Sequence, residues 1–384
     1  MAILVKMISC DSKTDTTEPS NFECEDRRQP VMRNYSKPIL DRKVRFALVG
    51  CGRIAKSHFS ALKQHQERAE FVGVCDIDTK ALEAAATETG ATPYTNLSEL
   101  LSESDADIVV LSTPSGLHSE QAIEVAGSGR HVMTEKPMAT RWQDGLRMVK
   151  ACDDAGVRLL VVKQNRHNTT LRLLKRAVDT GRFGRIYMVC INVFWTRPQT
   201  YYDSATWRGT WEFDGGAFMN QASHYVDLLD WLIGPIESVQ AYVATLARNI
   251  EVEDSGAMNV RWRSGALGSV NVTMLTYPKN LEGSITVIGE KGTVRVGGIA
   301  VNEIQHWEFA EPHADDDKVR DASYKTTSVY GFGHTLYYDN VIKVVRGEAR
   351  PETDGREGLK SLEVLIATYL SARDGRRVAL PLDY

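Results

Sequence analysis

A short apolar run that turns directly into glycines is the feature that most limits how this chain can fold. Residues 44–49 (VRFALV) lead straight into residues 50–55 (GCGRIA), a G-x-G-x-x-A sequence. Here Gly50 permits a tight turn, Gly52 lets the backbone approach a phosphate, and Ala55 lets the next helix pack on the strand. The N–H groups and positive dipole end of that helix then favour an anion. The pattern predicts a strand–turn–helix unit that binds a dinucleotide.

An acid at the end of the next apolar run selects the cofactor. Residues 71–75 (FVGVC) end at Asp76, 21 positions past Ala55, which is the separation expected for the acid that binds the adenosine ribose. A carboxylate accepts hydrogen bonds from both ribose hydroxyls and repels a 2′-phosphate, and residues 77–78 provide no cation for such a phosphate. The sequence therefore predicts NAD rather than NADP. For Arg53, a phosphate contact and an exposed surface position are both open.

Strands alternate with helices up to residue 163. Further apolar runs lie at 108–111, 131–133 and 157–162, and helical patterns lie between the runs, at 54–64, 80–88, 120–126 and 141–154. This alternation is typical of a parallel sheet with helices on both faces. We expect an α/β fold in which residues 43–163 form a doubly wound Rossmann domain that binds NAD.

The pattern changes after Lys163. One helix is predicted over 169–180, and runs rich in β-branched residues follow at 186–195, 239–245, 256–262, 266–275, 284–288 and 293–296. They predict an open, mainly antiparallel sheet with one face covered by helices near 222–231, 333–346 and 357–372. We expect residues 164–384 to form an α+β domain for substrate binding and oligomerisation. A bare sheet face would suit a homodimer or homotetramer.

Composition and charge exclude several classes of function. The net charge is −4, and no basic cluster is interleaved with aromatic residues, so we expect no nucleic-acid partner. No stretch approaches the roughly 20 apolar residues that span a bilayer, so we expect a cytoplasmic protein without a membrane partner. The six cysteines form no CxxC pair and no histidine cluster has metal-ligand spacing, which predicts reduced thiols and no metal. Residues 1–42 are polar and aperiodic, and we expect a disordered arm there.

A second motif places a lysine at the ligand-binding edge of the predicted sheet. Residues 134–137 (TEKP) follow the apolar run at 131–133 directly. Ligands of open α/β sheets bind outside the carboxyl ends of the strands, so Lys136 is expected to point into that crevice. An isolated E-K-P favours a surface turn, but its place in the Rossmann pattern favours a functional role.

Together these motifs resemble the glucose–fructose oxidoreductase/inositol dehydrogenase/rhizopine catabolism (Gfo/Idh/MocA) family over residues 43–384. The resemblance rests on residues 50–55, Ser112-Thr113-Pro114 with His118, Glu135-Lys136-Pro137, Trp207-Arg208, and Gly215-Gly216 leading to Asn220 and His224. It implies that Lys136 and His224 flank the nicotinamide and the reacting carbinol. The expected cofactor contacts are Gly50, Gly52, Arg53, Ile54, Asp76, Thr113, His118 and Glu135. For His118, a role at a helix start is equally open.

Residues 163–166, 192–198, 220–225 and 251–255 resemble one branch of that family, the UDP-N-acetylglucosaminuronate 3-dehydrogenases. This resemblance implies NAD-dependent oxidation of the C3 hydroxyl of UDP-N-acetylglucosaminuronic acid to a 3-keto sugar, for surface-polysaccharide (O-antigen) biosynthesis. Such a substrate carries a carboxylate and a diphosphate, so an arginine is a suitable partner. The candidates are Arg166, first, and then Arg197 and Arg208, each of which could instead form a structural salt bridge.

The chain departs from the family pattern at one position. The family commonly has an aspartate four residues before the histidine, and this chain has Asn220. Residues at i and i+4 share a helix face, so Asn220 and His224 are expected side by side as substrate contacts together with Lys136. An asparagine can orient a hydroxyl but does not stabilise an imidazolium. The change also removes one negative charge from the pocket, which suits an anionic substrate.

Two other functions stay open from the sequence. One is an NAD-dependent dehydrogenase of another polyol or sugar, such as inositol. The other is a non-catalytic protein that binds NAD and a sugar to control a partner, against which the presence of both Lys136 and His224 argues. For a dehydrogenase we expect His224 to act as acid/base and Lys136 to stabilise the reacting oxygen, although the two roles could be exchanged.

Overall fold

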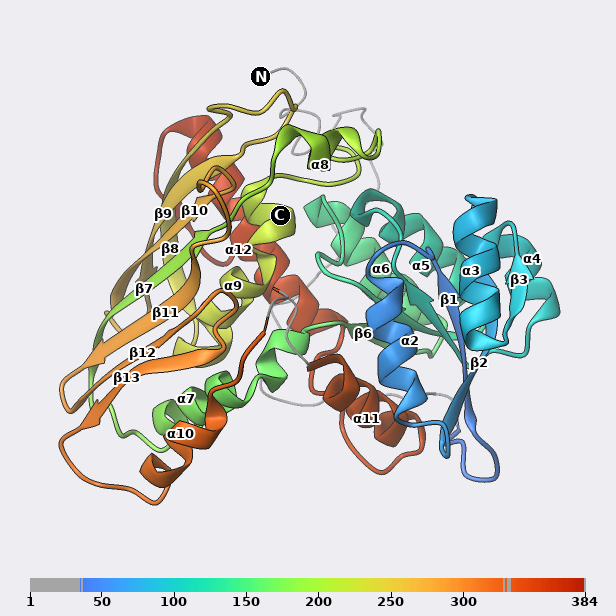
Figure 1. Cartoon of the computed structure of the whole chain (residues 1–384), viewed down its shortest axis with the longest axis horizontal. Coiled ribbons are helices and arrows are strands. Elements are labelled where there is room, and N and C mark those ends of the chain that lie inside the picture. The colour runs from blue at the N-terminus through green and yellow to red at the C-terminus, as the bar shows by residue number, and fades with distance from the viewer. Residues whose placement is uncertain (1–34, 36, 327–328, 330–332, 383–384) are drawn as a thin grey trace, which may run out of the picture.

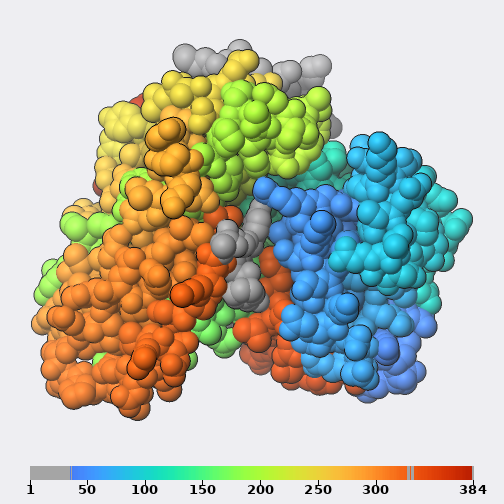
Figure 2. Space-filling view, viewed as in Figure 1, coloured from blue at the N-terminus to red at the C-terminus, as the bar shows by residue number. Residues whose placement is uncertain are grey.

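Two sheets organise the chain in the computed structural model, which describes residues 35, 37–326, 329 and 333–382 (Figure 1). The first sheet has six strands in the order β3-β2-β1-β4-β5-β6, and the second has eight in the order β13-β12-β11-β7-β10-β9-β8-β14. The predicted fold class is therefore confirmed: a Rossmann domain is followed by a domain built on a second, mainly antiparallel sheet. In the space-filling view the two domains are separate lobes on either side of a groove (Figure 2).

Every neighbouring pair of strands in the first sheet is parallel. Its central strands are apolar because both faces are buried: in β1, Phe46 and Leu48 lie in one core and Ala47 and Val49 in the other. The strands are β1 (Val44–Val49), β2 (Ala69–Cys75), β3 (Thr92–Tyr94), β4 (Ile108–Leu111), β5 (His131–Thr134) and β6 (Leu159–Val161). The helices between them are α2 (Ala55–Lys63), α3 (Thr79–Thr89), α4 (Leu97–Glu103), α5 (His118–Gly127) and α6 (Trp142–Asp154).

The second sheet is antiparallel except where β7 pairs with β10. Along β7 the buried residues Val189, Ile191 and Val193 alternate with more exposed ones, so one face of the sheet is inside. The strands are β7 (Ile186–Phe194), β8 (Ile236–Ala244), β9 (Ser255–Trp262), β10 (Leu267–Thr273), β11 (Glu282–Gly289), β12 (Gly292–Gly297), β13 (Glu303–Phe309) and β14 (Val378–Ala379). The helices of this part include α7 (Thr169–Asp179), α8 (Gln199–Asp203), α9 (Ser223–Leu228), α10 (Val319–Ala322), α11 (Gly333–Val345) and α12 (Gly355–Asp374).

Helix α11 corrects one expectation. It does not cover the second sheet, as we expected for residues 333–346, but packs beside α2 on the Rossmann sheet (Figure 1). The ring of Tyr338 lies 5.3 Å from that of Phe46, and His65 Nε2 lies 2.8 Å from the Thr335 carbonyl oxygen. The apolar face of α11 completes a core that α2 and α3 cover only in part. The chain therefore returns to its first domain before α12 packs against both α6 and β8.

The N-terminal arm falls mostly outside the described residues, since these exclude residues 1–34 and 36. Just after them, the Ile39 backbone N–H donates to the Val345 carbonyl at 3.1 Å, so the chain entering β1 packs on the end of α11. Among the described residues, no helix combines the length and the apolar character needed to cross a bilayer.

Candidate active site

The turn between β1 and α2 has the geometry that its glycines predict. Gly50 has φ +95°, and a Cβ atom there would lie 2.7 Å from the carbonyl carbon of Ser112, so only glycine fits. A Cβ atom on Gly52 would meet nothing within 4 Å, so the backbone there can be approached closely. Helix α2 begins after Ile54, and no side chain caps its first N–H groups. This turn fits the diphosphate of a dinucleotide.

Asp76 is anchored next to that turn. One of its carboxylate oxygens accepts the Cys51 N–H at 2.6 Å, and the other accepts the Asp78 N–H at 2.8 Å. These bonds hold the carboxylate at the carboxyl end of β2, beside the glycine turn, where a ribose would lie. Arg53, on the same turn, is exposed and lies with its guanidinium 5.7 Å from the Tyr201 ring.

The loops after β4 and β5 are tied together by His118. Its ring is completely buried, with Nε2 3.0 Å from the Thr113 carbonyl oxygen and Nδ1 3.0 Å from the Pro137 carbonyl oxygen. Burial lowers the pKa of His118. The residue begins α5, so the structure describes the helix-start role that the sequence left open. We infer that His118 acts on a cofactor through the Thr113 loop rather than by direct contact.

Lys136 follows β5 at the edge of the sheet where ligands bind. Its side chain is half-buried, and Nζ donates a hydrogen bond to the Asn220 carbonyl oxygen at 3.2 Å. Burial lowers the pKa of Lys136, while the negative charges of Glu135 and Asp214 oppose that change. The ammonium thus contacts the segment that leads to His224.

His224 lies near the start of α9 and is buried. The side-chain amide of Gln164 lies 2.8 Å from its Nε2 atom. Burial, followed by the positive charge of Lys136, holds the pKa of His224 well below its usual range. The structure therefore brings a neutral imidazole and a lysine ammonium together from distant parts of the chain. Gln164 belongs to a stretch noted in the sequence, but no sequence pattern identified it as the partner of His224.

Asn220 and His224 do not share one helix face, contrary to expectation. Asn220 lies in a π-helical turn, η3 (Ala217–Gln221), where the Ala222 N–H donates to the Ala217 carbonyl, and α9 begins only after Ala222. The side-chain amide of Asn220 donates instead to the carboxylate of Asp214. The π-helical turn contacts Lys136 through its backbone, because the Asn220 carbonyl oxygen accepts a hydrogen bond from the Lys136 ammonium.

Asp214 brings a carboxylate next to Asn220, which the sequence did not predict. Its side chain is buried and also accepts the Gly209 N–H at 2.7 Å. Burial raises the pKa of Asp214 to about 6. The available signal was an acid directly before Gly215 and Gly216.

Arg166, the first substrate-binding candidate, forms the structural salt bridge that was its alternative. Its Nε and Nη2 atoms donate to the two oxygens of Asp227 at 2.7 and 2.8 Å, and Nη1 donates to Glu357 at 3.1 Å. The side chain is only 7% exposed. These carboxylates already occupy the guanidinium, so we no longer propose that Arg166 binds substrate.

Three other arginines gather around one tyrosine beside the lysine. The guanidinium carbons of Arg53, Arg197 and Arg208 lie 5.7, 5.5 and 4.5 Å from the centre of the Tyr201 ring. The Tyr201 hydroxyl accepts from Arg208 Nη1 at 2.8 Å. Both Tyr201 and Arg53 act electrostatically on Lys136. This arginine cluster makes the surroundings of Lys136 suitable for an anionic ligand.

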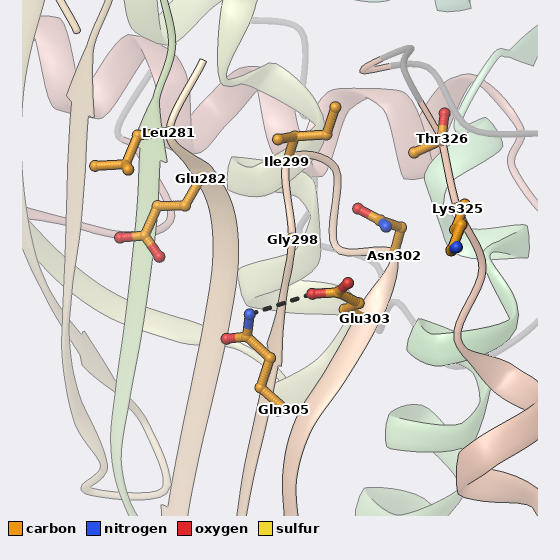
Figure 3. A pocket seen from close by; sticks show the side chains of 9 residues that line it. All are labelled: Leu281, Glu282, Gly298, Ile299, Asn302, Glu303, Gln305, Lys325 and Thr326. Carbon is orange, nitrogen blue, oxygen red and sulfur yellow. Dashed lines mark hydrogen bonds between the residues drawn. The ribbon is translucent and has the colours of Figure 1, made fainter. Parts of the chain in front are cut away.

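A pocket of about 740 Å³ lies on the second domain (Figure 3). Its lining includes Glu282 and Glu303, and the Gln305 amide donates to Glu303 at 3.5 Å. The Ile299 carbonyl, also at this pocket, accepts the Trp195 indole N–H at 3.1 Å. The lining includes neither Lys136 nor His224, so this pocket is separate from the site described above.

Both domains of one sequence family match this chain. The "Oxidoreductase family, NAD-binding Rossmann fold" (GFO_IDH_MocA) covers residues 44–163, and the "Oxidoreductase family, C-terminal alpha/beta domain" covers residues 175–380. The chain belongs to this oxidoreductase family. The resemblance seen in the sequence is thus confirmed, as is NAD as the cofactor.

Two solved structures of relatives have high sequence identity to the chain. One is the WlbA dehydrogenase from Chromobacterium violaceum in complex with NADH and UDP-GlcNAcA, 73% identical with a TM-score of 0.88 over 91% of this chain and 99% of that one. The other is the WlbA dehydrogenase from Bordetella pertussis with the same two ligands, 70% identical with a TM-score of 0.88 over 90% and 100%. A D-apiose dehydrogenase from Paraburkholderia graminis is 25% identical over 88% of this chain and 90% of its own.

Proposed function

We propose that this oxidoreductase oxidises the C3 hydroxyl of UDP-N-acetylglucosaminuronic acid (UDP-GlcNAcA) to the 3-keto sugar, with NAD as the hydride acceptor. The product would serve the synthesis of surface polysaccharide such as O antigen. The observation that carries the proposal is the convergence of Lys136 and His224 beside the dinucleotide turn. The identity of the sugar rests on the two WlbA dehydrogenases, which hold NADH and UDP-GlcNAcA.

The two side chains divide the proton chemistry. Bound NAD supplies the acceptor for the hydride that leaves the carbinol carbon. His224 is neutral at pH 7, because burial and the charge of Lys136 lower its pKa, so it can accept the hydroxyl proton. Lys136 donates a hydrogen bond to the reacting oxygen and stabilises the negative charge that develops on it. Asp214 and Asn220 hold the segment that the Lys136 ammonium contacts.

The arginine cluster around Tyr201 explains a preference for an acidic nucleotide sugar. Arg53, Arg197 and Arg208 bring three positive charges to one tyrosine that also acts on Lys136. A guanidinium binds a carboxylate or a phosphate through two parallel hydrogen bonds. We therefore expect the uronate or the diphosphate to lie at this cluster.

A matched pair of nucleotide sugars tests the proposal. UDP-GlcNAcA should bind in calorimetry and should produce NADH, followed by absorbance, together with a 3-keto product. UDP-GlcNAc differs only in carrying a hydroxymethyl group in place of the carboxylate, and we expect its kcat/KM to be lower by about 10²-fold or more, because the arginine cluster would lose its anionic partner. Equal turnover of the two sugars would contradict the role of the carboxylate. NADH formation from myo-inositol alone would favour a polyol dehydrogenase, and binding of NAD and sugar without turnover would favour a regulatory protein.

We also propose that the protein is a homo-oligomer joined through the second sheet. Met188 lies opposite Leu267 on one neighbouring strand and opposite Ile288 on the other, and all three side chains are exposed. Such a row of apolar side chains on an open sheet face favours association with a second copy. Light scattering should give the mass of a dimer or tetramer, and Met188→Glu should lower it. A monomeric mass for the unmodified protein would contradict this proposal.

A further inference from the structure

A buried group of titratable side chains lies directly behind Lys136. The Oε1 atom of Glu135 lies 3.2 Å from His58 Nε2 and 3.4 Å from His334 Nε2. Its Oε2 atom accepts the backbone N–H of Lys136 at 3.2 Å. His58 comes from α2, the dinucleotide helix, and His334 from the start of α11. The carboxylate therefore joins three separate parts of the chain next to the lysine.

This arrangement differs from the role that the sequence gave to Glu135. Glu135 is only 5% exposed, and both of its oxygens lie against protein groups. His58 is completely buried and His334 is 4% exposed. The Nδ1 atom of His58 lies 3.0 Å from the Tyr338 hydroxyl, which fixes the orientation of its ring. The carboxylate is thus fixed by these protein groups directly beside the backbone of Lys136.

We propose that Glu135 is a positioning residue, a buried anion clamped by His58 and His334 that keeps the ammonium of Lys136 charged for the reaction. The effect on catalysis rests on the proposed function, whereas the effect on the charge of Lys136 rests on the geometry alone. A carboxylate beside a buried ammonium offsets part of the cost of taking that charge out of water. His58 and His334 hold the anion in place, because burial alone would favour its protonated form.

The charges around the two groups support this assignment. Burial would raise the pKa of Glu135, but His334 and His58 hold that pKa well below its usual range. The groups that face Lys136 are Glu135, Tyr201, Asp214, Arg53 and His224. Burial lowers the pKa of Lys136, and the charge of Glu135 is the largest influence that raises it. Tyr337 and Tyr338 of α11 also face the carboxylate, and its charge raises the pKa of each further. Loss of the Glu135 charge should therefore lower the pKa of Lys136.

The substitution Glu135→Gln keeps the shape and removes the charge. We expect the titration of Lys136 to move to lower pH by about one unit or more. It can be followed without any activity assay by NMR of ¹³C-dimethylated protein, with the Lys136 signal assigned by its absence in Lys136→Met. Both limbs of the pH profile of kcat should also move to lower pH, because Glu135 raises the pKa of His224 as well. The affinity for NADH should stay within about twofold, since both oxygens of Glu135 are held by protein groups.

Further variants separate positioning from folding. His58→Gln should give a smaller shift in the same direction, because His334 and the Lys136 N–H still hold the carboxylate, and Glu135→Asp should restore part of the original profile. The matched control is His306→Gln on exposed β13, which should change nothing.

Three results would overturn the proposal. The first is an unmoved Lys136 titration in Glu135→Gln, and the second is a selective loss of NADH affinity in that variant. The third is one equivalent of tightly bound metal in the purified protein, because the imidazole nitrogens would then bind an ion instead of the carboxylate. If the Lys136 titration moves as expected in Glu135→Gln but the unmodified protein does not turn over UDP-GlcNAcA, only the proposed function is contradicted.

Discussion

Replacing Lys136 with methionine should reduce kcat by about two to four orders of magnitude, with NADH still bound at nearly its original affinity. Methionine has a similar length but cannot donate to the reacting oxygen or stabilise its developing charge. In the described part of the chain, the hydrogen bond that Lys136 Nζ donates goes to the Asn220 carbonyl oxygen. Stopped-flow measurement of NADH formation gives kcat, and fluorescence titration gives the NADH affinity.

The thermal midpoint of Lys136→Met should change little, because Glu135, the carboxylate that faces the ammonium, is also held by His58 and His334. A matched control is Lys150→Met on the exposed side of α6, where Lys150 pairs with Asp154 at 2.6 Å; its kcat should equal that of the unmodified protein. Turnover of Lys136→Met within about tenfold of normal would exclude the lysine from the chemical step.

The parts of the site that the sequence predicted are those whose partners lie nearby along the chain. The turn at Gly50 and the acid at Asp76 are joined by one βαβ unit, so spacing alone places them together. Lys136 was placed correctly because the carboxyl ends of parallel strands meet at one edge of the sheet. In these cases the local sequence pattern and the topology of the parallel sheet place the residues at the same position.

The parts that the sequence missed depend on contacts between distant segments. Periodicity shows that residues 333–346 have an apolar face, but it does not show which sheet receives that face, and α11 packs on the first one. In the same way, an arginine such as Arg166 has equal sequence reasons to bind a ligand or a carboxylate. The choice is made by Asp227, from another helix. The short strand β3 was missed for a local reason, because it has only three residues and contains Pro93.

The second large effect is expected from the buried ion cluster around Asp227. Replacing Asp227 with alanine should lower the free energy of unfolding by about 3–5 kcal/mol, because the buried Lys163 and Arg166 lose the anion that they share and only the pair of Arg166 with Glu357 remains among the residues that the structure describes. The carboxylate lies 2.7 Å from Arg166 Nε and 3.3 Å from Lys163 Nζ, and the three side chains are 3–7% exposed. Urea denaturation measures the loss. The control Asp179→Ala breaks an exposed i,i+4 pair with Lys175 and should change stability by at most about 1 kcal/mol.

The pH dependence of that loss identifies its electrostatic origin. Burial raises the pKa of Asp227, but Arg166 and Lys163 outweigh it and hold this pKa below the unfolded value of about 4. A lowered pKa in the folded protein contributes stability above the unfolded pKa, and this contribution is lost as the pH falls toward the folded one. The stability difference between the unmodified protein and Asp227→Asn should therefore shrink below about pH 4. A difference independent of pH would mean that lost packing, not lost charge, destabilises the variant.

The same cluster connects stability to catalysis. Arg166 lies in the 3₁₀ turn η2 (Gln164–His167), and Asp227 lies in α9, so their ion pair joins the segment that carries Gln164 to the helix that carries His224. When the pair is broken, Gln164 is no longer held 2.8 Å from His224 Nε2. We therefore expect Asp227→Ala to lose stability and kcat together, whereas Lys136→Met loses kcat alone. A variant of Asp227 with lower stability but unchanged kcat would show that Gln164 is not needed to orient the imidazole.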